Sequence, residues 1–351
     1  MKISLQTIPK AELHVHLRGA MPVGVFTSLL NKYSGEGMLS KASEQAIAWY
    51  GQHDNIVPFM SPRQWTVEEV LPLFSTRTFD EFIATFSFTG YFIRDAADFR
   101  LLVSGVLEGL KAQSVVYAEI TVSAREYVRQ GVALPDLLAA LDEAAARPDI
   151  RVQWIVDLVR DFGVSAGLEL LHQIIEMRHK SVVGITIGGS EHLFPPAQFA
   201  PVYDLAREHG LRLTIHAGEA LGPESVWDAL KLGVERIGHG VRAIEDPALV
   251  KYLAEQKVPL EVCPTSNLRT GIYPSYEAHP VKALYEAGVP ITISTDDPTF
   301  FHTTLADEYE HVHNIGVSEE GLLEMLKNGF RYAFLPEDEK SRYLPMLPDN
   351  G

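Results

Sequence analysis

The sequence contains almost no cysteine and no long apolar run, and both shortages narrow the class of protein. Cys263 is the only cysteine in 351 residues, so no disulfide forms within the chain and a Cys-x-x-Cys metal motif is excluded. No apolar run reaches the roughly 18 residues of a membrane span, and Met1 to Lys10 lacks the apolar core of a secretory signal. We expect a soluble protein of the reducing cytoplasm.

Cationic side chains are also scarce. The chain has 30 Lys and Arg residues against 46 Asp and Glu residues, which gives a formal net charge of -16. This balance argues against nucleic acid or an anionic membrane as the partner. The 46% hydrophobic content is enough for one large core, so we expect a single catalytic domain over residues 1–351, with a homodimer as one assembly to test.

Short β-branched runs alternate with helical patterns along the chain, and this alternation predicts the fold. The expected strands are residues 13–17, 115–122, 152–159, 182–187, 211–215, 236–239, 260–263 and 290–294. Segments between them have helical spacing and suitable caps, as in residues 134–146 and 247–256. Eight such alternations of nearly continuous apolar strands predict an α/β TIM (β/α)8 barrel.

The segment from Asn31 to Thr78 is the main insertion that we expect in this barrel. It is rich in Gly, Ser, Pro and aromatic residues, and it follows the first strand on the side where loops build active sites. We expect a helical insertion, which acts either as a lid over the site or as a peripheral packing element.

His14 and His16 lie in the first expected strand and are the most informative pair of residues. Alternation along a strand directs both imidazoles to the same side, which supplies half of a zinc site. Further titratable groups end later apolar runs: His216 and Glu219, then His239, then Asp296 with Asp297. Strand ends meet at one face of a barrel, so these groups are expected to converge.

The converging residues suit one zinc ion with a free position for water. Zinc accepts imidazole nitrogen and carboxylate oxygen, and the candidate ligands are His14, His16, His216 and Asp296. Bound zinc lowers the pKa of its water to about 7, which supplies a nucleophile at neutral pH. The chain therefore looks like a metallohydrolase.

Three neighbouring residues are candidates for proton transfer and substrate binding. Glu219 is placed to donate a proton, or else to support a ligand from outside the metal shell. His239 lies between two glycines and suits a base acting on the water, the alternative being a structural core histidine. Asp297, next to Asp296, is expected to form a hydrogen bond with the substrate.

These motifs resemble the adenosine deaminase family of the amidohydrolase superfamily. The resemblance is carried by four ordered motifs that span most of the chain: Pro9-Lys10-Ala11-Glu12-Leu13-His14-Val15-His16-Leu17, His216-Ala217-Gly218-Glu219, Gly238-His239-Gly240 and Ser294-Thr295-Asp296-Asp297-Pro298. It implies a mononuclear zinc barrel that hydrolyses the 6-amino group of a purine. Binuclear relatives carry a bridging lysine on the fourth strand, and residues 182–189 contain none, which favours one zinc ion per chain.

The resemblance also implies a role for each site residue. Glu219 would protonate ring nitrogen 1, while His239 with Asp296 would orient and deprotonate the water. Asp297 would bond ring nitrogen 7. Gly189 matches the family glycine whose backbone N–H meets ring nitrogen 3, although a generic tight turn explains this glycine nearly as well.

Arg18 departs from the pattern of adenosine-specific members, which have an aspartate at this position. An arginine suits recognition of a carboxylate or phosphate, and it resembles the aminodeoxyfutalosine deaminases of the futalosine route to menaquinone. That resemblance implies a purine nucleoside with an anionic 5′ substituent. The alternative is a rim arginine paired with a local carboxylate such as Glu191.

The helical aromatic cluster around Phe82 and Phe86 is expected to pack against the barrel, with one of the two touching the substrate. Two other functions stay open. One is deamination of adenosine or adenine in purine salvage, and the other is a catalytically inactive barrel that only binds purines. Measured turnover with stoichiometric zinc separates the enzymes from the binding protein.

Overall fold

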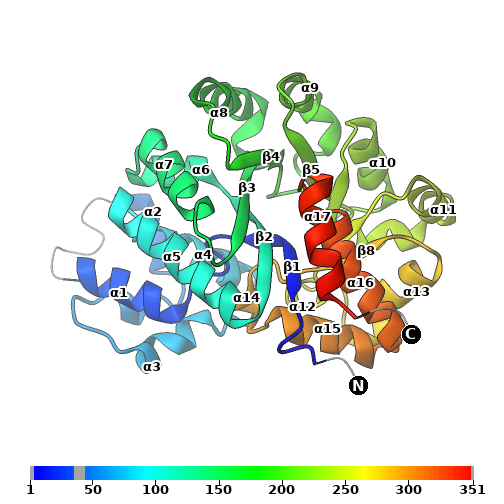
Figure 1. The fold of residues 1–351 in the computed structure, drawn as a ribbon. Coiled ribbons are helices and arrows are strands. Elements are labelled where there is room, and N and C mark those ends of the chain that lie inside the picture. Colours follow the sequence, from blue (N-terminus) through cyan, green and yellow to red (C-terminus); the bar gives the residue numbers. More distant parts are fainter. Residues whose placement is uncertain (1–3, 35–43, 349–351) are drawn as a thin grey trace.

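The structure is a computed structural model that describes residues 4–34 and 44–348 (Figure 1). Within these residues, eight parallel strands pair in sequence order from β1 to β8. A parallel bridge between Val15 and Asp296 joins the last strand to the first. The strands are β1 (Lys10–His16), β2 (Val115–Val122), β3 (Arg151–Asp157), β4 (Val182–Thr186), β5 (Arg212–Ala217), β6 (Arg236–His239), β7 (Leu260–Val262) and β8 (Ile291–Ile293).

This arrangement confirms the predicted TIM barrel. Two strands, β2 and β6, have the predicted bounds, and the other six overlap their predictions. The largest difference at a start is in β1, which begins at Lys10 instead of Leu13. β3 ends at Asp157 instead of Val159 because the Asp157 carboxylate accepts the Val159 N–H at 2.9 Å, and Val159 turns to a φ of 48°.

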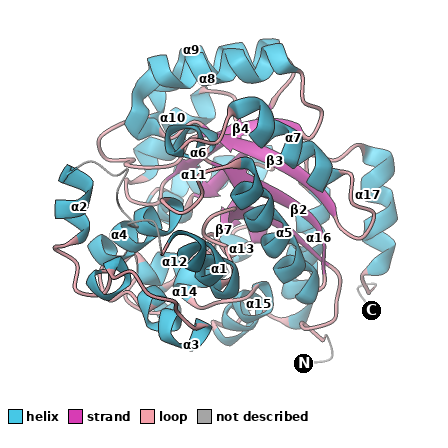
Figure 2. Ribbon diagram, turned by 90° about the vertical axis from the view of Figure 1, so that its left-hand side faces the viewer, coloured by secondary structure: helices cyan, strands magenta, loops and turns pink. Residues whose placement is uncertain are grey.

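Helices follow each strand and surround the barrel (Figures 1 and 2). Those between β2 and β8 are α6 (Ala124–Gln130), α7 (Leu134–Ala145), α8 (Gly163–Met177), α9 (Ala200–Glu208), α10 (Pro223–Lys231), α11 (Pro247–Gln256), α12 (Pro264–Arg269) and α13 (Val281–Glu286). After β8 come α14 (Pro298–Phe301), α15 (Leu305–Asn314), α16 (Glu319–Arg331) and α17 (Glu337–Tyr343). Short 3-10 helices η3 (Arg160–Phe162), η4 (Pro196–Phe199), η5 (Val241–Glu245), η6 (Tyr276–Ala278) and η7 (Leu344–Met346) join several of them.

The connection from β1 to β2 is long and helical, in line with the expected insertion. Its elements are α1 (Val23–Tyr33), α2 (Glu44–Tyr50), η1 (Val57–Met60), α3 (Val67–Val70), η2 (Leu71–Phe74), α4 (Phe79–Gly90) and α5 (Ala96–Ala112). Figures 1 and 2 show α1 to α4 on one side of the barrel. Residues 35–43 of the predicted insertion lie outside the described residues.

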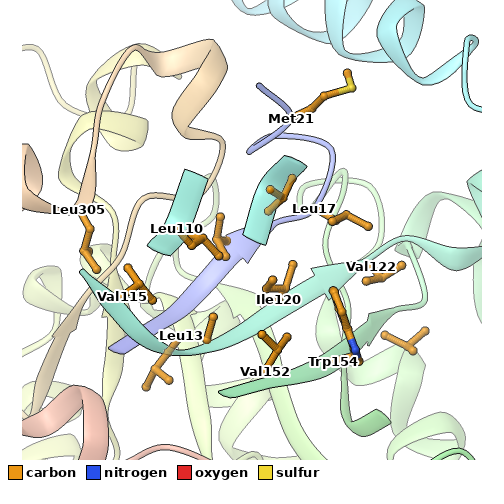
Figure 3. Close-up of a cluster of buried hydrophobic side chains, with 14 of the residues drawn as sticks. Leu13, Leu17, Met21, Leu110, Val115, Ile120, Val122, Val152, Trp154 and Leu305 are labelled. Carbon is orange, nitrogen blue, oxygen red and sulfur yellow. The ribbon is translucent and has the colours of Figure 1, made fainter. Parts of the chain in front are cut away.

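The barrel and its helices enclose a continuous apolar core. Figure 3 shows buried side chains around β1, β2 and β3, including Leu13, Ile120 and Trp154, each at most 2% exposed. Burial of large apolar side chains on both faces of the strands stabilises the barrel. No helix within residues 4–34 and 44–348 has both the length and the apolar character of a membrane span.

Candidate metal centre and active site

The predicted site residues converge at the carboxyl ends of the strands. β1 carries His14 and His16, β5 carries His216, and β6 ends with His239. Asp296 follows β8 and reaches β1 through backbone hydrogen bonds. His239 and Asp296 adopt positive φ angles of 61° and 63°, which are uncommon for residues with a Cβ and are frequent at functional sites.

The side-chain atoms of this group lie close enough to share one ion. One ligand atom from each of His14, His216, His239 and Asp296 lies within 4.8 Å of the others. Nε2 of His16 lies 3.1 Å from Nε2 of His216 and 3.2 Å from Oδ1 of Asp296. Ligand atoms about 2.1 Å from one zinc ion lie roughly 3 to 3.5 Å apart, so this spacing fits a shared metal site.

The hydrogen bonds of His14 show that its free nitrogen suits a metal. Nδ1 lies 2.8 Å from a Glu261 carboxylate oxygen, so Nδ1–H donates and Nε2 keeps its lone pair. Nε2 is buried and has no hydrogen-bond partner among the described residues, although it lies 3.7 Å from Asp296. An orphaned acceptor inside this cluster fits a metal ligand.

Asp296 and His216 are also held by neighbouring hydroxyl groups. Ser266 donates to Oδ2 of Asp296 at 2.6 Å, so Oδ1 remains directed at His16 and His14. The Thr186 hydroxyl lies 3.4 Å from Nδ1 of His216, which leaves Nε2 of that imidazole on the side of the cluster. Such outer contacts fix the orientation of metal ligands.

Glu219 stands beside the cluster on a turn that a second carboxylate holds. Its Oε2 lies 3.5 Å from Nε2 of His239, and burial, with further contributions from Asp296 and Glu191, raises the pKa of Glu219 to about 8. Glu191 accepts backbone N–H groups on either side of Glu219, from Gly218 at 2.7 Å and Ala220 at 2.8 Å. A protonated carboxyl group in a fixed position suits an acid.

Asp297 lies next to Asp296 in the site, and Gly189 lies in the turn after β4. Burial and the neighbouring Asp296 raise the pKa of Asp297 to about 7, and its Oδ1 has no hydrogen-bond partner among the described residues. Gly189 has a φ of 99°, and a Cβ there would lie 2.1 Å from an Asp161 oxygen. The positive φ favours glycine at this turn after β4, because residues with a Cβ rarely adopt it.

Arg18 lies in a small cavity beside the metal cluster. The cavity is lined by His16, Leu17, Arg18, Phe86, Thr121, Ser123, Glu126 and Tyr127. The Arg18 guanidinium is centred 3.8 Å from the Phe86 ring and lies 2.5 Å from a Glu126 oxygen. The local carboxylate considered from the sequence, Glu191, instead supports the Glu219 turn.

The two predicted aromatic contacts occupy different surroundings on α4. Phe86 lines the cavity beneath Arg18. Phe82 is buried and packs against Phe300 and Phe301, with ring centroids 5.6 and 5.1 Å away. Phe86 is therefore the better placed of the two to meet a substrate, whereas Phe82 lies in the aromatic packing behind it.

Three contributors to the site escaped the sequence analysis: Glu261, Ser266 and Asn267. Nδ2 of Asn267 lies 3.3 Å from Nδ1 of His239. All three follow or lie within β7, one of the predicted strands to which no site residue was assigned. The rule that barrel sites form at strand ends would have pointed to Ser266 and Asn267, but not to Glu261, which lies within the strand.

A parallel barrel with a histidine and aspartate cluster at its carboxyl ends defines a hydrolase of the amidohydrolase type. The family model described as adenosine deaminase matches residues 50–348, most of the chain. The chain belongs to the adenosine deaminase family.

Similar proteins cover nearly the whole chain. An adenine deaminase of Sinorhizobium fredii is 34% identical over 346 residues, which are 97% of this chain and 98% of that protein. An aminodeoxyfutalosine deaminase of Streptomyces avermitilis is 35% identical over 344 residues, covering 95% and 89%.

Solved structures agree with the fold. The adenine deaminase of Arthrobacter aurescens has a TM-score of 0.82 and 26% identity, covering 97% of this chain and 98% of that one. An amidohydrolase of Burkholderia ambifaria with bound Zn has a TM-score of 0.77 and 25% identity, covering 98% and 92%.

Proposed function

We propose that this chain deaminates aminodeoxyfutalosine, an adenine nucleoside with a benzoate in place of its 5′-hydroxyl. At the coarser level of reaction class, the chain is a hydrolytic deaminase of aminopurines, as the family match and both groups of relatives support. The proposal places the reaction in the futalosine route to menaquinone and in the cytoplasm.

The site supplies the residues that such a hydrolysis requires. His14, His16, His216 and Asp296 would hold one zinc ion, which when bound makes water a stronger nucleophile at neutral pH. Nε2 of His14 is buried and has no hydrogen-bond partner among the described residues. This observation is the one that best supports a metal there.

The protein side chains then handle the purine ring and its protons. Glu219, whose pKa is raised to about 8, would donate a proton to ring nitrogen 1 as the water adds to carbon 6. Asp297, in its protonated form, would donate to ring nitrogen 7, and the Gly189 N–H would face ring nitrogen 3. Ammonia leaves after the amino group receives the water's proton.

Arg18 carries the part of the proposal that concerns the benzoate. Its Nε is buried and has no hydrogen-bond partner among the described residues, so one donor of the guanidinium is open to an anion. A carboxylate there would share Arg18 with Glu126, above the Phe86 ring. The relatives called aminodeoxyfutalosine deaminase support this assignment.

Adenine is the second candidate substrate, and two observations favour it. The Glu126 carboxylate already neutralises Arg18, so the guanidinium needs no anionic group from the substrate. Several relatives are adenine deaminases, including those of Sinorhizobium fredii and Agrobacterium fabrum.

Specificity constants of the zinc-loaded protein decide between the substrates. We expect kcat/KM for aminodeoxyfutalosine to exceed those for adenosine, adenine and methylthioadenosine by at least about tenfold, because only the benzoate engages Arg18. A higher value for adenine would replace the proposal with the second candidate. No turnover of any aminopurine would overturn both.

A further inference from the structure

Three buried side chains form a chain of hydrogen bonds that ends at His239. His279, before α13, lies 3.1 Å through its Nε2 from Oδ1 of Asn267. Nδ2 of Asn267 lies 3.3 Å from Nδ1 of His239. The three residues are at most 3% exposed, so water does not compete for these contacts.

The direction of each hydrogen bond in this chain follows from one backbone group. The Val281 N–H can only donate, and it lies 3.3 Å from Nδ1 of His279. Nδ1 of neutral His279 is therefore the acceptor, and Nε2 carries the proton. Burial favours this neutral form, because it lowers the pKa of His279 to about 3.

The Asn267 amide extends this assignment of donors and acceptors to His239. Since Nε2–H of His279 donates, Asn267 must present its carbonyl oxygen to His279 and its NH2 group to His239. Nδ1 of His239 then accepts, which leaves the proton of neutral His239 on Nε2. That nitrogen lies 3.5 Å from an oxygen of Glu219 and 4.0 Å from an oxygen of Asp296, and both oxygens are acceptors.

We propose that Asn267 and His279 are positioning residues that hold His239 as its Nε2–H tautomer. In that form His239 donates a hydrogen bond into the site and has no lone pair on Nε2 for a metal. The inference rests on the proposed function for its catalytic meaning: His239 orients the attacking water, and Asp296 takes the proton.

The proposal also decides between two possible sets of metal ligands, one with His239 and one with His16, which distances alone do not distinguish. His14, His216, His239 and Asp296 offer atoms within 4.8 Å, while His16 lies against the same group. A proton on Nε2 removes His239 from the metal shell. His16 then completes the set, as the sequence predicts.

The tautomer is measurable without any substrate. In the zinc-loaded full chain, with ¹⁵N-labelled histidine and His239→Asn to assign the signal, long-range ¹H–¹⁵N correlation should place the proton of His239 on Nε2. A proton on Nδ1, or a metal-bound Nε2, would overturn the proposal even if the chain proved to have another substrate.

Two variants at one position test the catalytic consequence. His279→Leu removes the donor, and we expect kcat to fall by about 10- to 100-fold, the usual effect of an outer-shell partner, with KM within about threefold and one zinc per chain retained. His279→Gln offers an amide N–H to Asn267 and should recover most of kcat.

The outcomes that contradict the proposal are also specific. Loss of zinc from the folded His279→Leu protein would make His239 a ligand. Equal activities of the Leu and Gln variants would show that the hydrogen bond from residue 279 does not matter. A rise in KM equal to the fall in kcat would point to general distortion instead of positioning.

Discussion

The mouth of the barrel and the interior beneath it both bury charged side chains, but they pair them differently. In the interior, each guanidinium nitrogen of Arg236 has an acceptor: Glu261 at 2.6 Å, Glu119, and the Tyr332 carbonyl at 2.8 Å. At the mouth, buried atoms of His14, Arg18 and Asp297 have no hydrogen-bond partner among the described residues.

This difference separates structural charge from functional charge. Burial alone would raise the pKa of Glu261, but Arg236 and His14 hold it below its usual value. At the mouth, burial and the nearby Asp296 and Glu191 carboxylates raise the pKa of Glu219 to about 8, against a smaller opposing effect of His14 and His16. Complete pairing stabilises the barrel, whereas incomplete pairing leaves groups available to a metal, a proton or a substrate.

The largest effect should come from the acid at the mouth. In Glu219→Gln, the amide cannot transfer a proton, so we expect kcat to fall by about 100- to 10,000-fold while the zinc content is unchanged. Steady-state kinetics and metal analysis on the same sample check this. Retained activity would show that another residue is the acid and that the raised pKa of Glu219 has no catalytic role.

Removing the interior cation should instead affect stability. Arg236→Met leaves Glu119 and Glu261 buried without their partner, and we expect a loss of about 3 to 5 kcal/mol in the free energy of unfolding. Denaturant titration measures it. Arg100→Met, at an exposed pair with Glu143, is the control and should cost less than about 1 kcal/mol. Equal losses would erase the distinction.

Arg18 tests whether a charged group at the mouth serves the substrate. Arg18→Met should weaken transition-state binding of aminodeoxyfutalosine, measured from kcat/KM, by about 2 to 4 kcal/mol, the scale of a charge-assisted pair. The loss for adenine should be much smaller. Arg125→Met, which loses the exposed Glu169 carboxylate and the Ala166 carbonyl as partners, is the matched control. A similar reduction for both substrates would make Arg18 a structural residue.

Glu308 is a buried carboxyl group whose hydrogen-bond partners are neutral, and it makes the stability of the barrel depend on pH. Burial raises its pKa to about 7, although hydrogen bonds from Thr265 and Thr303 oppose the shift. In the folded state Glu308 therefore keeps its proton up to about pH 7. In the unfolded state it loses this proton above its ordinary pKa, near 4.3. The contribution of protonated Glu308 to the free energy of unfolding is complete below the pKa of the unfolded state and is lost as pH rises toward 7.

Glu308→Gln should flatten this fall in stability, which is at most about 4 kcal/mol between those pH values. Unfolding free energies at several pH values give the slope. Glu310→Gln, at an exposed position of the same helix, should leave the slope as it is. An unchanged slope in the Glu308 variant would show that Glu308 does not titrate in this range.

The sequence allowed the barrel and most of the site to be predicted because both depend on local patterns. Apolar runs marked all eight strands, and polar residues at their ends marked the histidines, Glu219 and the two aspartates. The contribution of β7 was missed because Ser266 and Asn267 are neutral and occur commonly in turns. Glu261 was missed because one acidic residue inside a short strand has no distinguishing spacing.

The sequence by itself determined which kinds of side chain stand at the ends of the strands, since strand alternation and apolar runs are properties of neighbouring residues. Only the tertiary structure decided the partner of each. Glu261 holds His14 across 247 positions of the chain, and Arg18 lies against Glu126 and not Glu191. Charge and proton positions depend on such contacts, and contacts between distant residues exist only after the barrel has closed.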